Sequence, residues 1–185
     1  LTFLTFALTF LAFAFFACSR PCLALSLFAF QFAHCPPYRR FCERRGCTPE
    51  NVRSWVDVPP VPTGAFKELP LRSFPEERLA HVFRTSGTSV ERRGELHLDT
   101  LALYEASLIA PFRRFLLPDL HTGQEPLIYA LAPSPAEARD SSLSHMFAVA
   151  IRELGADGSR FFLSGGELEL DALLDAMTQT PADRP

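Results

Sequence analysis

The alternation of apolar and polar residues predicts strands and helices in turn over the second half of the chain. Residues 81–84 predict a strand, and residues 95–98 alternate at period two, as a half-buried strand does. The short polar segment between them predicts a hairpin. Further along, the pattern predicts a helix from Asp99 or Thr100 to about Phe115, a strand over 126–132, a helix over 142–154, a strand over 160–163 and a last helix over 167–177. Such alternation favours an α/β fold, a layered sheet with flanking helices.

The first part of the chain predicts helix and then extended backbone. From about Leu23 a largely apolar stretch predicts a helix that Pro36 and Pro37 interrupt. Further prolines predict an extended connector over residues 58–75, because proline cannot donate to a helix or to a central strand. These prolines are Pro59, Pro60, Pro62 and Pro70. Apolar residues at helical spacing are expected in the core rather than at a ligand, namely Phe66, Leu108, Phe112 and Phe115.

Residues 1–17 carry no charge and contain the unit Leu-Thr-Phe three times. We treat residues 1–22 as an apolar, low-complexity leader, separate from residues 23–185, and the leading hypothesis is a mis-called start. A signal peptide or an anchor is the alternative, although no basic segment precedes the apolar run and it is shorter than the ~20 residues that cross a bilayer. A membrane partner is therefore not expected.

Composition narrows the class of protein. The chain has 185 residues, 48% of them hydrophobic and 21% charged, with a net charge of −3, which excludes a disordered chain and favours one core. The slight acidity disfavours a nucleic-acid partner. An odd number of cysteines cannot form a complete disulfide framework, so reduced thiols and a cytoplasmic location are expected. The cysteines are Cys18, Cys22, Cys35, Cys42 and Cys47.

The segment between the two predicted strands is rich in hydroxyl residues. It contains Thr85, Ser86, Gly87, Thr88 and Ser89. Gly87 would let the backbone approach an anion closely, while amides and hydroxyls would donate to phosphate oxygens. An ordinary turn is the alternative, and neither a Walker motif nor a Rossmann glycine motif is present. The histidines show no metal-ligand spacing, so no metal site is expected from them.

Several motifs occur in an order that is similar to one known family. They are FQFAHCPPYRRFCERRG from Phe30, SWVDVPPVPTGAFKEL, VFRTSGTS, the segment from Asp140 to Met146, and Gly165-Gly166. Over residues 23–185 the chain resembles the acyl-protein synthetase (LuxE) family of adenylate-forming enzymes, the fatty-acid-activating subunits of bacterial luminescence.

The resemblance implies the N-terminal part of an adenylate-forming domain. Such an enzyme uses ATP and Mg²⁺ to convert a long-chain fatty acid to an acyl-adenylate, and then passes the acyl group to a protein thiol. The implied partners are the fatty acid and an acyl-acceptor or reductase subunit. Residues 85–89 match the family's phosphate loop, and Arg92 or Arg93 would supply a cation. The alternative is that both are solvated arginines of the hairpin. Val90 and Glu91 depart from the pattern, because the family commonly places Gly there.

The resemblance also implies that the catalytic residues lie outside this chain. In the family, the catalytic Lys and the acyl-accepting Cys follow later, so the chain is expected to be an N-terminal fragment that is inactive alone. His145 is either part of an acyl pocket or a histidine on a helix surface. A non-catalytic scaffold that has lost ATP binding is the second hypothesis, and an exported or membrane-anchored protein is the third.

Overall fold

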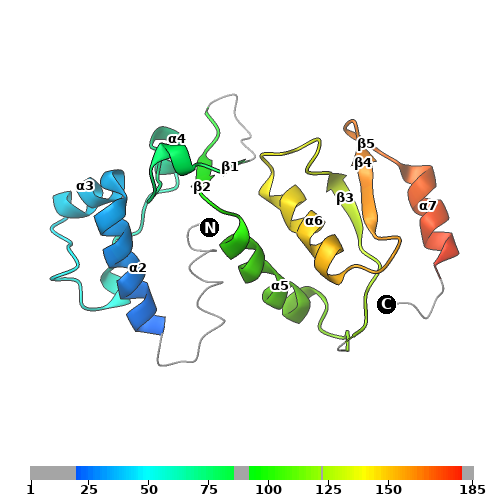
Figure 1. Ribbon diagram of the computed structural model, residues 1–185, viewed down its shortest axis with the longest axis horizontal. Helices are drawn as coiled ribbons and strands as arrows, with labels where there is room; N and C mark the ends of the chain where they lie inside the picture. The colour runs from blue at the N-terminus through cyan, green and yellow to red at the C-terminus, as the bar shows by residue number, and fades with distance from the viewer. Residues whose placement is uncertain (1–19, 86–91, 122, 181–185) are drawn as a thin grey trace. The chain divides into compact units, whose positions relative to one another are not determined.

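The computed structural model describes residues 20–85, 92–121 and 123–180 (Figure 1). The contacts divide the chain into two compact units, residues 1–101 and residues 102–185. We call them the N-terminal unit and the C-terminal unit and describe each by itself. The chain length favours one core, whereas the buried residues form separate clusters in the two units.

Two helices, α2 (Arg20–His34) and α3 (Pro36–Arg44), begin the described part of the N-terminal unit. The predicted break at the proline pair is confirmed, since α2 ends at His34 and Pro36 starts α3, where a missing amide does no harm. Arg39 closes the corner, because its Nε donates to the carbonyl of Phe32 at 2.8 Å and its Nη2 donates to the carbonyl of Ala33.

The core of the N-terminal unit lies between α2, α3 and the segment that follows them. It comprises Phe28, Cys35, Tyr38, Cys42 and Val52. The ring of Tyr38 is buried, and its hydroxyl donates to the carbonyl of Pro59 at 3.0 Å. This hydrogen bond fixes the proline-rich segment against α3.

The connector over residues 58–75 is less extended than predicted. A helical turn, α4 (Ala65–Glu68), lies within it, and the 3₁₀ turns η1 (Trp55–Asp57) and η2 (Glu76–Arg78) flank it. The prediction of a continuous extended segment is wrong at residues 65–68, because no proline interrupts the chain between Pro62 and Pro70. The first turn forms when the amide of Ala65 donates to the carbonyl of Pro62 at 3.0 Å.

The predicted hairpin is confirmed. Strands β1 (His81–Arg84) and β2 (Glu95–Leu98) pair antiparallel, with Arg84 opposite Glu95 and His81 opposite Leu98. Phe83 on β1 is buried, and it lies opposite Leu96 on β2.

The C-terminal unit starts with helix α5 (Ala102–Leu116) and continues with strand β3 (Tyr129–Pro133), helix α6 (Ser142–Leu154) and strand β4 (Arg160–Ser164). Strands β3 and β4 are parallel, and α6 is the crossover between them. The predicted bounds of α6 are confirmed, and its first turn is capped by Ser141, whose side chain accepts from the amide of Ser144.

The last predicted helix begins later than expected. Residues 167–168 form an edge strand, β5 (Glu167–Leu168), that pairs antiparallel with β4, and helix α7 spans Leu170–Gln179. The turn between β4 and β5 consists of Gly165 and Gly166, whose φ angles of 59° and 84° favour glycine. The prediction of helix from residue 167 is therefore wrong, because this turn reverses the chain into a strand.

Helices α5 and α6 share the core of the C-terminal unit. Phe112 is buried with Ala150 and Leu154, and Leu108 packs against them, as predicted. The prediction for Phe115 is wrong, since it is 59% exposed in the last turn of α5, while Leu117 beyond the helix end packs against the cluster. Phe66 in the N-terminal unit is half-buried.

The α/β class is confirmed in part. The described residues form a two-stranded sheet and a three-stranded sheet with helices in both units, rather than one layered sheet. In the described part of the chain, no helix is long and apolar enough to cross a membrane.

Candidate functional site

The base of the hairpin loop is held by a reciprocal pair of hydrogen bonds. The amide of Thr85 donates to the carbonyl of Gly94 at 2.9 Å, and the amide of Gly94 donates to Oγ1 of Thr85 at 2.9 Å. Gly94 is buried, and a Cβ there would lie 3.3 Å from Oγ1 of Thr85 and 3.5 Å from Cβ of Phe66. A side chain would therefore crowd the hydroxyl of Thr85 and only touch Phe66. The pair of hydrogen bonds fixes where the loop leaves and re-enters the sheet.

Of the five predicted loop residues, the structure describes Thr85 alone. Its amide is already paired, so this amide is no free donor for a phosphate, although its hydroxyl accepts one bond and still has a proton to donate. The others lie outside the described residues: Ser86, Gly87, Thr88 and Ser89.

The two predicted arginines, Arg92 and Arg93, lie where the chain returns from the loop, and their side chains have different partners. Nε of Arg93 donates to the carbonyl of Thr85 at 2.8 Å, so this side chain holds the base of the hairpin. Nη1 of Arg92 lies 3.4 Å from Oε2 of Glu68, with both side chains more than 60% exposed. Such an exposed pair contributes little stability, so the guanidinium of Arg92 can exchange Glu68 for another anion at little cost.

A charged cluster lies on one face of the hairpin, beside the loop. The carboxylate of Glu95 accepts from Nε of Arg84 at 3.0 Å and lies 3.2 Å from Nε2 of His97. The hydrogen bond from Arg84 lowers the pKa of Glu95, so this carboxylate stays ionised and faces its own cation rather than a ligand. Sequence reasoning missed this cluster. The signal was available, because residues 84 and 95 lie the same number of residues from the loop on either side and so pair in an antiparallel hairpin.

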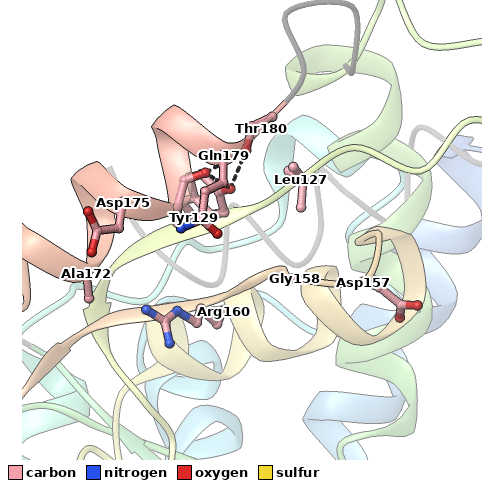
Figure 2. Close-up of a pocket in the computed structure, with 10 residues that line it drawn as sticks. Leu127, Tyr129, Asp157, Gly158, Arg160, Ala172, Asp175, Gln179 and Thr180 are labelled. Atoms are coloured by element: carbon pink, nitrogen blue, oxygen red, sulfur yellow. Dashed lines mark hydrogen bonds between the residues drawn. The ribbon is translucent and has the colours of Figure 1, made fainter.

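A groove in the C-terminal unit lies where β3 and β4 begin and α7 passes beside them (Figure 2). Its volume is about 560 Å³. Sequence reasoning placed no site here, because the residues that line the groove come from three separate segments of the chain, 127–129, 157–160 and 172–180.

One wall of the groove is rigid. The hydroxyl of Tyr129 lies 2.9 Å from Oγ1 of Thr180 and donates to the carbonyl of Ala176 at 3.3 Å, which ties β3 to the end of α7 (Figure 2). Tyr129 also meets the buried ring of Phe162 edge-on, with the ring centroids 5.2 Å apart. The groove is therefore built on the sheet rather than on a loop.

A second charged cluster joins helices α5 and α6. Nε2 of His145 lies 2.9 Å from Oε1 of Glu105, and Nη2 of Arg152 donates to Oε2 of the same carboxylate at 2.8 Å. The hydrogen bond from Arg152 lowers the pKa of Glu105. His145 thus faces α5, and its side chain is only 17% exposed; its place in an acyl pocket stays a prediction. The spacing of seven residues between His145 and Arg152 was the available signal, since it puts both on one helix face.

The cysteines of the described chain are unpaired thiols, and their environments differ. Cys35 and Cys42 are buried in the core, as expected of a thiol that behaves as a small hydrophobe, while Cys22 is exposed. Burial raises the pKa of both buried thiols, which makes them poor nucleophiles. Cys18 lies outside the described residues.

The described residues do not suit a bound Mg²⁺ ion. Near the hairpin the carboxylates of Glu68 and Glu95 pair with arginines, and no group of three or more His, Cys, Asp or Glu in the described ranges could hold a metal ion. For the triphosphate of ATP, the described base of the loop offers the Thr85 hydroxyl and the exposed Arg92 guanidinium.

Comparison of the chain with models of known protein families, with curated proteins and with solved structures finds no match.

Proposed function

We propose that the hairpin loop binds the phosphates of ATP in an adenylate-forming enzyme of the acyl-protein synthetase type. The proposal rests on the ordered motifs and on one structural observation. The two strands that flank the hydroxyl-rich segment pair in register, and the Thr85–Gly94 bonds close the base of the loop. A closed base reduces the entropy that the loop loses when it orders around an anion.

In this proposal the described residues have distinct roles. Arg93 holds the base through the carbonyl of Thr85, while Arg92 leaves Glu68 and pairs with a phosphate oxygen. The carboxylate of a long-chain fatty acid then attacks the α-phosphorus of ATP, and pyrophosphate leaves. A protein thiol loses its proton, attacks the acyl carbon of the adenylate to form a thioester, and AMP leaves. Mg²⁺ would neutralise the charge of the phosphates. The substrate itself, or residues outside the described ranges, would hold this ion. The proposed setting is the cytoplasm, with an acyl-acceptor or reductase subunit as partner.

The test is ATP binding by the chain, measured by calorimetry. Because the resemblance places the catalytic Lys and the acyl-accepting Cys elsewhere, we expect binding rather than turnover from these residues. Pyrophosphate should compete with ATP, and Arg92→Ala should weaken binding about tenfold, the loss expected for one charged contact. Arg78→Ala is the matched control, because Arg78 pairs with Asp99 at 2.6 Å in the same unit and should not affect ATP.

One observation favours the second hypothesis, a scaffold of the same fold without ATP binding. The amide of Thr85 is paired with Gly94, which removes one donor from the proposed cradle. A ligand that binds only the folded state raises the melting temperature by mass action. A melting temperature that stays unchanged in millimolar ATP would therefore favour the scaffold and reject the ATP site.

A further inference from the structure

The groove beside α7 contains opposite charges that do not pair with each other. Arg160 lies on β4, Asp175 lies on α7, and Asp157 lies in the turn before β4. All three side chains are exposed, and within the described ranges none of them forms an ion pair. Because the guanidinium and the two carboxylates do not pair with one another, their donors and acceptors can bind a ligand in the groove.

An aromatic ring positions Arg160. Its guanidinium carbon lies 4.3 Å from the centroid of the buried Phe162 ring, two residues along the same strand. This cation–π contact orients the guanidinium without using its N–H donors. A planar guanidinium with open donors binds a carboxylate through two parallel hydrogen bonds.

The acidic residues limit what else the ligand can contain. In Figure 2 the guanidinium of Arg160 points to the side of Ala172 and Asp175, while the carboxylate of Asp157 points away from it. A second negative charge on the ligand would meet Asp175 and be repelled. A positive charge at the same place would be attracted.

The remaining lining fits a small polar molecule rather than a lipid. Gln179 and Thr180 are polar, and the apolar part is short, with Leu127, Ala172 and Ala176. The groove also lies at the amino ends of the parallel strands β3 and β4, whereas nucleotides in α/β sheets bind at the carboxyl ends. Both points separate this groove from the proposed ATP and fatty-acid sites.

We propose that the groove binds a small zwitterion, with its carboxylate on Arg160 and its ammonium group on Asp175. The site is independent of the function proposed for the hairpin, and loss of ATP binding would leave it unchanged. The rigid Tyr129 wall fixes Arg160 relative to α7, so the site selects the distance between the two charges of the ligand.

The experiment titrates the ¹⁵N-labelled chain with glycine, β-alanine and γ-aminobutyrate, whose charges are progressively further apart. Amide shifts are followed at Gly158 and Gln179, which line the groove. Acetate supplies the carboxylate alone, and ethylammonium supplies the cation alone. We expect one zwitterion to bind at least tenfold more tightly than either half.

Variants assign the two contacts. Arg160→Gln and Asp175→Asn should each weaken zwitterion binding at least tenfold, and Asp175→Asn should leave acetate binding unchanged. The controls are Arg139→Gln and Asp171→Asn, two exposed charges of the same unit outside the groove, and both should bind within twofold of the wild type.

Circular dichroism establishes that each variant is folded, and Asp175→Asn, on the exposed surface of α7, provides the test if Arg160→Gln unfolds. Three results would overturn the proposal: no zwitterion binds, acetate or ethylammonium binds as tightly as the best zwitterion, or the control variants lose as much affinity as the groove variants.

Discussion

Replacing Glu105 with Gln tests the charged cluster that joins helices α5 and α6. The substitution keeps the size of the side chain but removes the charge that binds His145 at 2.9 Å and Arg152 at 2.8 Å. The side chain of Glu105 is 27% exposed, which places these bonds between a solvated ion pair and a buried one. We expect a loss of about 1–2 kcal/mol in the free energy of unfolding. For a unit of this size, that loss lowers the melting temperature by at least about 4 °C.

The pH dependence of this loss follows from the lowered pKa of Glu105. A carboxyl with a lower pKa in the folded state stabilises the fold above its unfolded pKa, about 4.3, and loses this contribution as the pH falls through the folded value. The wild type should therefore exceed Glu105→Gln in stability at neutral pH, and the difference should shrink in acid.

Urea unfolding followed by circular dichroism measures both effects. The matched control is Glu153→Gln, because Glu153 binds the same Arg152 at 2.8 Å but is 47% exposed and has no helix-to-helix role. Its effect should stay within about 0.5 kcal/mol. Equal stability of Glu105→Gln and wild type at neutral pH, or a difference that persists unchanged in acid, would refute the reasoning.

Three further predictions concern other parts of the fold. Ser141→Ala removes the cap of α6 and should cost about 1 kcal/mol in urea unfolding, whereas Ser142→Ala, one residue inside the helix, should cost clearly less; equal losses would contradict the capping role. Tyr38→Phe leaves the Pro59 carbonyl without its donor and should cost about 1 kcal/mol by the same assay, and an unchanged midpoint would show that the bond contributes nothing. Pulsed iodoacetamide labelling read by mass spectrometry should modify Cys22 in the native protein and spare Cys35 and Cys42 until urea is added, because burial raises the pKa of both. Rapid native labelling of Cys42 would contradict this.

The sequence predicted elements well where one local signal dominates. The pattern over residues 142–154 predicted both ends of α6, and the segments 81–84 and 95–98 predicted both strands of the hairpin. The prediction of elements from the sequence was wrong where two local signals compete. Residues 167–177 have helical spacing throughout, but the Gly165-Gly166 turn pairs Glu167 with Ser164 before the helix can start.

Sites proved harder to predict than elements, because side chains distant in sequence form them. Glu105 meets His145 across 40 residues, and Tyr129 meets Thr180 across 51. Periodicity indicates the face on which a residue lies, but it does not indicate which face of another element will lie opposite. The hairpin loop could be named as a candidate site because its residues are contiguous in the sequence, and the phosphate-binding role of Thr85 and Ser86–Ser89 stays a prediction.

The most direct test of the ATP site follows the loop amides themselves. The ¹⁵N-labelled chain is titrated with ATP, and amide shifts are recorded across the sequence. We predict the largest changes at Ser86, Gly87, Thr88 and Ser89, smaller ones at Thr85, whose amide is paired with Gly94, and none at Gly158 in the other unit. Loop amides that do not shift at millimolar ATP would contradict the proposal that this hairpin binds the phosphates of a nucleotide.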